Sequence, residues 1–156
     1  MLILELKDLH LSDISFLERT KNIKKLILDR GLYSIKDFTF LSNLETLEYL
    51  FIDFGSKEID ISFLGGNKNI KELKINSEYT FDYSFLSTLE KLEFLFLESS
   101  KISDFSFMNK NIKKLTLIDC DEIKDYSFIS YLENLESLYI TRRYKDLNNF
   151  TNISFL

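Results

Sequence analysis

Hydrophobic residues recur along the chain in two marks that repeat together. The first mark is an L-x-L/I pair, and its seven copies are Leu4/Leu6, Leu26/Leu28, Leu50/Ile52, Leu73/Ile75, Leu95/Leu97, Leu115/Leu117 and Leu138/Ile140. The second mark is a Ser/Thr-Phe-apolar triplet, and its copies begin at Ser15, Thr39, Ser62, Ser84, Ser106, Ser127 and Ser154. Both series advance by about 20 to 27 residues, which indicates one structural unit repeated along the chain.

The L-x-L/I pairs predict short β-strands, because apolar residues two positions apart lie on the same face of an extended chain. Seven such strands, about 4.8 Å apart, would form a short parallel sheet with the aliphatic pairs facing the core. The Ser/Thr-Phe-apolar triplets fall on the return side of each coil. There we expect the phenylalanines to stack in the interior as a ladder.

Two kinds of coil alternate along the chain. Three coils carry the spacing S-x-L-E, in which a serine and a glutamate can satisfy free amides at the start of a helix; the pairs are Ser42 with Glu45, Ser87 with Glu90, and Ser130 with Glu133. This spacing predicts a short helix on the return side of each of these coils. The coils between them read KNIKKL or KNIKEL instead and predict irregular structure or a turn of 3₁₀ helix.

These residues resemble the leucine-rich repeat family, and within it the short internalin-like class. One coil of that class is matched by Leu89, Leu92, Leu95, Leu97, Ile102, Asp104-Phe105 and Phe107. The resemblance covers the whole chain and implies an α/β leucine-rich repeat solenoid. Its curved parallel sheet would have about seven short strands, with short helices or irregular turns on the convex side. No linker divides residues 1–156, so we expect a single domain without separate cap domains.

The chain departs from the family in the turn after each strand. The family usually places Asn or Cys three residues after the second strand leucine. Here that place is occupied by Leu9, Gly31, Gly55, Glu78, Ser100, Cys120 and Arg143. We therefore expect no continuous asparagine ladder in this turn.

The parity of the strands predicts a binding face on the concave side of the sheet. If Leu95 and Leu97 face the core, Phe94 and Phe96 face outward. The same register exposes Tyr49 and Phe51, then Ser137 and Tyr139, and in the alternate coils Lys25 with Ile27, Glu72 with Lys74, and Lys114 with Thr116. Asp29, Asp53, Glu98 and Asp119 form an acidic margin. The candidate protein-binding residues are Tyr49, Phe51, Asp53, Lys74, Phe94, Phe96, Glu98 and Tyr139.

Two interpretations of these outward aromatic residues compete. Large aromatic side chains bury about 150 to 250 Å² each, and soluble monomers seldom leave a contiguous apolar patch of several hundred Å² uncovered. This favours a protein interface. Alternatively, the rings only stabilise the sheet by packing across neighbouring strands. Lys74 separates the two densest aromatic pairs in sequence, which weakens the argument for a single patch.

The net charge of -5 restricts the class of partner. Nucleic acid and anionic membranes both require a basic face, so neither is expected, whereas a basic protein partner fits. The segment MLILELKD lacks the features of a secretory signal, and no apolar run approaches the ~20 residues of a membrane helix. Because a single cysteine can form no internal disulfide, we expect a cytoplasmic location.

Catalytic chemistry is not expected. The single histidine, His10, and the single cysteine, Cys120, provide no nucleophile with a matched base, and no metal or phosphate-binding motif occurs. We therefore expect no cofactor and no metal, a surface or turn position for His10, and a buried structural position for Cys120. The basic cluster Arg142, Arg143 and Lys145 is interpreted as a solvated loop, with a charged end of the binding face as the alternative.

The leading functional hypothesis is a non-enzymatic adaptor or scaffold that binds another protein on its concave face. The alternative is an acidic immunity or inhibitor protein that occludes a basic toxin or enzyme. A third hypothesis is an assembly subunit whose ends stack. Solenoid ends need polar caps, but this sequence starts in the strand MLILEL and stops on an apolar triplet, so we expect homodimer formation through uncapped ends.

Overall fold

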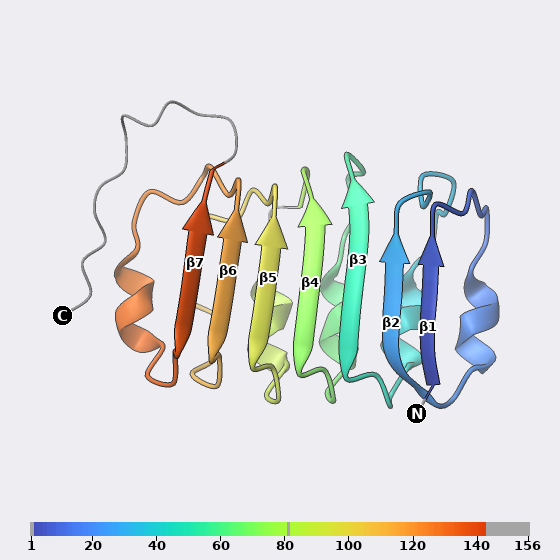
Figure 1. Cartoon of the computed structure of the whole chain (residues 1–156), viewed down its shortest axis with the longest axis horizontal. Coiled ribbons are helices and arrows are strands. Elements are labelled where there is room, and N and C mark those ends of the chain that lie inside the picture. Colours follow the sequence, from blue (N-terminus) through green and yellow to red (C-terminus); the bar gives the residue numbers. More distant parts are fainter. Residues whose placement is uncertain (1, 81, 143–156) are drawn as a thin grey trace.

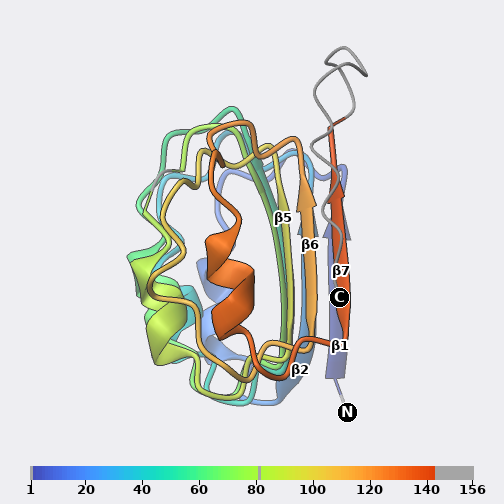
Figure 2. The ribbon, with the colours of Figure 1, turned by 90° about the vertical axis from the view of Figure 1, so that its left-hand side faces the viewer.

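The computed structural model describes residues 2–80 and 82–142, which form a right-to-left series of coils, each containing one strand (Figure 1). The seven parallel strands are β1 (Leu2–Lys7), β2 (Ile23–Asp29), β3 (Tyr49–Gly55), β4 (Glu72–Ser77), β5 (Phe94–Glu98), β6 (Lys114–Ile118) and β7 (Ser137–Thr141). Their order in the sheet is their order in the sequence. Figure 2 shows the short helices on the opposite side, with β1 and β7 farther from them than β5, so the sheet is concave on its free face.

The strand register confirms the prediction of a leucine-rich repeat solenoid. Each aliphatic residue of an L-x-L/I pair stands opposite its counterpart in the next strand, as Leu73 does with Leu95 and Ile75 with Leu97. The pairs of β2 to β5 are fully buried, whereas those of the outer strands β1 and β7 are only partly buried. The core therefore lies between the sheet and the return side, and each coil covers the core of its neighbour.

The return side carries five 3₁₀ helices among the described residues: η1 (Ser15–Arg19), η2 (Thr39–Asn43), η3 (Ser62–Gly66), η4 (Ser84–Thr88) and η5 (Ser127–Tyr131). An aspartate two residues before each helix accepts a hydrogen bond from the first helical N–H, as Asp82 does from Ser84 at 2.8 Å. These hydrogen bonds hold the pKa of the carboxyl of Asp82, and of its counterparts, below the usual value. The helices thus begin at the motif Asp-x-Ser/Thr-Phe.

The predicted capping boxes are wrong. The hydroxyl groups of Ser42, Ser87 and Ser130 instead donate to the carbonyl oxygens of the residues three positions earlier, at 2.7 or 2.8 Å. These serines lie inside the 3₁₀ helices, because the helices begin three residues earlier than the boxes would place them. The predicted difference between the two kinds of coil is also wrong, since η1 and η3 have the same form as η2 and η4.

The predicted phenylalanine ladder is wrong as well. Phe40, Phe85 and Phe128 of the triplets are buried, but Phe16 is 54% exposed. The interior is filled instead by the residues on either side of the Ser/Thr-Phe pair, such as Tyr83 and Leu86 in one coil. In a turn this tight, consecutive side chains diverge, so the phenylalanine lies between neighbouring coils near the surface.

The turn that follows each strand has no asparagine ladder, as expected, and uses other devices. Asp8, Arg30, Ser99 and Asp119 adopt left-handed backbone conformations there. In one coil the hydroxyl of buried Tyr83 donates to the Oγ of buried Ser100 at 2.6 Å. An asparagine ladder is found instead in the turn before the strands. Asn69, Asn111 and Asn134 each donate from Nδ2 to a carbonyl of the preceding coil at 2.7 or 2.8 Å.

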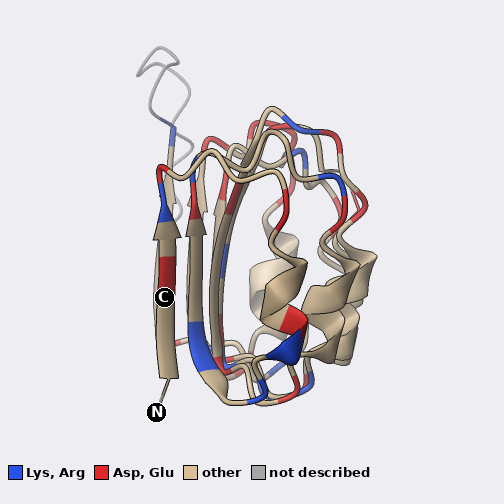
Figure 3. Ribbon diagram, turned by 90° about the vertical axis from the view of Figure 1, so that its right-hand side faces the viewer, with Lys and Arg blue, Asp and Glu red and all other residues tan. Residues whose placement is uncertain are grey.

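A second ladder, made of charges, runs along the same turn before the strands. One residue of each coil joins the backbone of the previous coil at this level, and the series is Lys24, Glu48, Lys71, Glu93, Lys113 and Glu136. Ion pairs connect Glu48 to Lys24 and to Lys71, and Glu93 to Lys113. The hydrogen bonds from Lys24 and Lys71 lower the pKa of Glu48 to about 2. Figure 3 shows charges of both signs in the loops at either end of the coils, whereas the helices are largely uncharged.

The described residues contain no helix that is long and apolar enough to cross a membrane.

The Tyr83–Ser100 hydrogen bond yields a stability prediction. Tyr83→Phe should lower the free energy of unfolding by about 1 to 3 kcal/mol, because it leaves a buried hydroxyl without its partner. Ser100→Ala should cost a similar amount, and the double variant should cost less than the sum of the two. Urea denaturation of all four proteins measures this coupling. Strictly additive losses would show that the hydrogen bond contributes nothing.

Candidate functional site

The concave face is built from three rows of outward side chains that run across the strands. The middle row, read from β1 to β7 through the strand register, is Glu5, Ile27, Phe51, Lys74, Phe96, Thr116 and Tyr139. The row beside it, nearer the start of the strands, contains Lys25, Tyr49, Glu72, Phe94 and Lys114. The parity predicted for Phe94 and Phe96 is therefore right, since both rings lie opposite the buried Leu95 and Leu97.

Lys74 joins the two aromatic pairs that it separates in sequence. Its Nζ lies 5.3 Å from the centroid of the Tyr49 ring and 5.1 Å from that of the Phe94 ring. The same Nζ forms an ion pair with Glu72 at 2.9 Å. Ammonium groups are attracted to the faces of aromatic rings, so Lys74 connects the rings instead of interrupting them. We call Tyr49, Phe51, Glu72, Lys74, Phe94 and Phe96 the Lys74 cluster.

The electrostatics of the cluster keep Lys74 charged. Partial burial lowers the pKa of its ammonium group, but the hydrogen bond and charge of Glu72, together with Tyr49, raise it more, so the pKa lies above the ordinary value. Lys25 approaches the Tyr49 ring from the other side, with its Nζ 4.4 Å from the centroid. Tyr49 thus lies between two ammonium groups. Sequence reasoning did not assign Lys25 or Glu72 to the site.

The rings of the cluster are half-buried, because they pack beside one another and beside Lys74. Tyr139 is different: it is 56% exposed and separated from Phe96 by Thr116, so the structure does not bring it into the cluster. Ile27 was expected to be exposed but is only 7% exposed. Larger side chains, Glu5 and Phe51, stand in register on both sides of it.

The third row, at the far end of the strands, contains the predicted acidic margin. Asp53 and Glu98 stand in register on either side of Asn76, and Asp29 lies two strands before Asn76. Burial raises the pKa of Asp53, and the charge of Asp29 raises it further, against the opposing effects of the Gly55 N–H, Arg30 and Asn76. The Gly55 N–H donates to Asp53 Oδ1 at 2.8 Å. A cation placed here would therefore favour the ionised form of Asp53.

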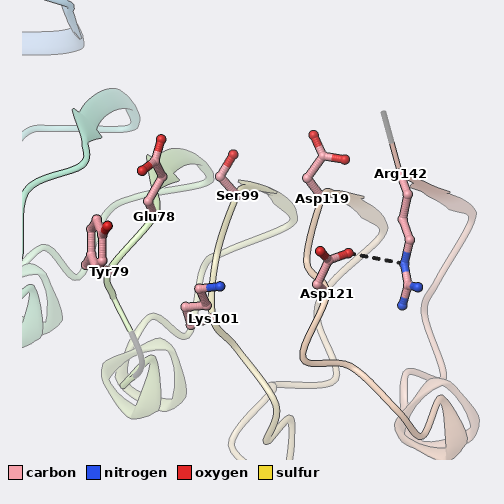
Figure 4. Close-up of a pocket in the computed structure, with 7 residues that line it drawn as sticks. All are labelled: Glu78, Tyr79, Ser99, Lys101, Asp119, Asp121 and Arg142. Atoms are coloured by element: carbon pink, nitrogen blue, oxygen red, sulfur yellow. Dashed lines mark ion pairs between the residues drawn. The ribbon is translucent and has the colours of Figure 1, made fainter. Parts of the chain in front are cut away.

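Beyond the acidic margin, the turns after β4 to β7 surround an open hollow of about 460 Å³ (Figure 4). Its lining includes Glu78, Tyr79, Lys101, Asp119, Asp121 and Arg142. Arg142 Nε forms an ion pair with Asp121 Oδ1 at 3.4 Å. Both signs of charge line this hollow, which gives it no clear preference for one kind of ligand. The other members of the basic cluster, Arg143 and Lys145, lie outside the described residues.

The residues examined for chemistry take structural positions. His10 is exposed in the turn after β1, as expected. Cys120 is buried, its Sγ lies 3.5 Å from the carbonyl oxygen of Ile118, and burial raises the pKa of its thiol to about 11. A thiol with so high a pKa is a poor nucleophile at neutral pH. In the part of the chain that the structure describes, no group of three or more His, Cys, Asp or Glu side chains is placed to hold a metal ion.

The in-register coils and the concave face with its ring and charge rows define a leucine-rich repeat protein. Among solved structures, the chain is similar to the crystal structure of internalin C2 from Listeria monocytogenes str. 4b F2365, with 30% sequence identity and a TM-score of 0.65. The match covers 88% of this chain and 70% of that chain. The chain therefore belongs to the internalin-like class of leucine-rich repeat proteins, as its sequence motifs predicted. No protein-family model and no curated protein sequence matches it.

This likeness supports the general class of function predicted from the sequence, a leucine-rich repeat scaffold that binds proteins. Proteins of this class are generally interaction modules without enzymatic activity.

The contacts of Lys74 yield a second stability prediction. Lys74→Met keeps the aliphatic stem but removes the charge, so the free energy of unfolding should fall by about 0.5 to 1 kcal/mol as the ring contacts are lost. Lys74→Arg should retain most of the stability. Lys114→Met is the matched control, because Lys114 is exposed on the same face. If chemical denaturation shows equal stabilities for the Met variants, the ring contacts of Lys74 contribute nothing.

Proposed function

We propose that this protein is a non-enzymatic adaptor or scaffold that binds a partner protein on its concave face. The Lys74 cluster receives apolar and polar groups of the partner, and Asp53 with Glu98 favours basic groups beside them. Tyr139 contacts the partner toward the β7 end of the same face. The whole chain acts as one repeat domain in the cytoplasm, and its lone cysteine, which is buried, is consistent with that compartment.

The observation that carries this proposal is the fixed position of Lys74 between two rings and a carboxylate. A surface whose side chains are already held in place loses little conformational entropy when a partner binds. Aromatic residues that surround a charged group combine apolar burial with directional hydrogen bonding, as binding hot spots do. The charge of Lys74 and its three N–H donors would fix the orientation of the partner on the rings.

The acidic margin supports a basic partner segment. Burial and the neighbouring Asp29 raise the pKa of Asp53, so ionised Asp53 is held at a cost in the free protein. A partner lysine or arginine beside Asp53 would offset that cost, and it would also speed association through the long-range attraction between opposite charges.

The same margin keeps a second function in view, an acidic immunity or inhibitor protein that occludes a basic toxin or enzyme. The acidic row beside the preorganised Lys74 cluster is the observation that favours it. The two functions differ in their effect on the partner, because an inhibitor abolishes the partner's activity when bound at equal molar amounts. An adaptor leaves that activity intact.

The proposed face yields a binding prediction. Phe51→Ala combined with Phe96→Ala should weaken capture of the partner at least ~10-fold, because loss of a central aromatic anchor costs about 2 kcal/mol or more. Affinity capture from the native cell, followed by titration of the captured protein, measures the loss. The protein should remain folded by circular dichroism, since both rings are only half-buried.

Phe16→Ala provides the matched control for this experiment. Phe16 is the same residue type, is 54% exposed and lies on the return side in η1. Capture should be unaffected by this change. If the double variant captures the partner as well as the unaltered protein does, the concave face is not the binding site.

A further inference from the structure

The outer edge of β1 leaves backbone and side chains without a neighbouring strand. Across residues 2–80 and 82–142, β2 is the only strand that pairs with β1, which lies at one end of the sheet (Figure 1). Leu2 and Ile3 are 41% and 46% exposed, and Leu4 and Leu6 are only partly buried. An edge strand of this kind offers a row of free N–H and C=O groups and an apolar face to another chain.

Two charges on β1 limit how another strand can add to this edge. Glu5 and Lys7 lie two residues apart on the concave side and form an ion pair at 3.0 Å. A single charge on an edge strand opposes pairing in most arrangements. A glutamate and a lysine two positions apart act selectively instead, because they repel strands that align like charges and attract strands that align opposite ones.

The spacing of these charges matches a second copy of the same strand in one arrangement. In an antiparallel pair related by a two-fold axis, one residue faces itself and its neighbours face each other in reverse order. Centring the pair on Glu5 or on Lys7 places like charges opposite each other, and parallel in-register pairing does so twice. Centring it on Leu4 pairs neither charge with an opposite one. Centring it on Leu6 places Glu5 of each copy opposite Lys7 of the other.

We propose that two copies of this chain associate through antiparallel pairing of their β1 strands, with Leu6 at the two-fold axis and two Glu5–Lys7 ion pairs between the copies. This arrangement covers the partly buried Leu4 and Leu6 of each copy. It also brings exposed Ile3 toward exposed Leu9 of the other copy. The two sheets join side by side, so their concave faces form one continuous surface of twice the length.

Exchanging the charges tests both the association and its register. Glu5→Lys alone and Lys7→Glu alone each place like charges opposite each other, so dimerisation should weaken at least ~10-fold in both variants. Glu5→Lys combined with Lys7→Glu should dimerise as the unaltered protein does. An equal mixture of the two single variants should form a heterodimer, because each supplies the charges that the other lacks. Sedimentation velocity over a range of concentrations measures all five samples.

The mixture separates this contact from the ion pair within one chain. Both single variants lose the intrachain pair, and mixing does not restore it, so recovery of the dimer reports contact between chains. Circular dichroism checks that each variant is folded. A mass of one chain at tens of micromolar for the unaltered protein would overturn the proposal. So would single variants that dimerise normally, or a series of masses that continues beyond two chains.

Discussion

Each coil of this protein lies on the next in register, at the ~4.8 Å spacing of neighbouring strands. A side chain is therefore surrounded by its own counterparts in the adjacent coils. Leucine and isoleucine satisfy this condition by stacking on themselves, as Leu73 does on Leu95. Like charges cannot, because they repel at so short a distance. The charge ladder before the strands solves the problem by alternating lysine with glutamate, and Glu48 forms ion pairs with the lysines on both sides. Two coils, not one, are thus the chemical repeat.

The same condition shapes the concave face. Aromatic residues of β3 and β5 alternate with the charged residues of β4, so that Lys74 lies in register between Phe51 and Phe96. Its side chain can then reach the Tyr49 and Phe94 rings, and Glu72 balances its charge. The alternation that stabilises the stack also produces a surface with apolar area, a fixed cation and an acidic margin. The proposed binding function uses a pattern that the architecture already requires.

The sequence was sufficient to predict the solenoid, its seven strands and the parity of each strand, because period-two leucine pairs repeated seven times leave little ambiguity. The return side was not predicted well. The S-x-L-E spacing satisfies a capping rule, but Asp82 and its counterparts start the turns earlier, and Ser87 lies within the helix. The signal for this was present as the motif Asp-x-Ser/Thr-Phe. At the candidate site, the residue list followed from parity, whereas the role of Lys74 could not. Its position over two rings depends on side-chain conformations that strand periodicity does not specify.

The most direct test of in-register stacking is the stability of a Lys71→Glu variant, which places three glutamates in succession along the charge ladder. We predict lower stability in urea at low salt than for Lys71→Met, and a difference between the two variants that shrinks at high salt as the repulsion is screened. Lys36→Glu, a change of the same charge at an exposed loop position, should have little effect. Equal stabilities of the Lys71→Glu and Lys71→Met variants at low salt would contradict the account.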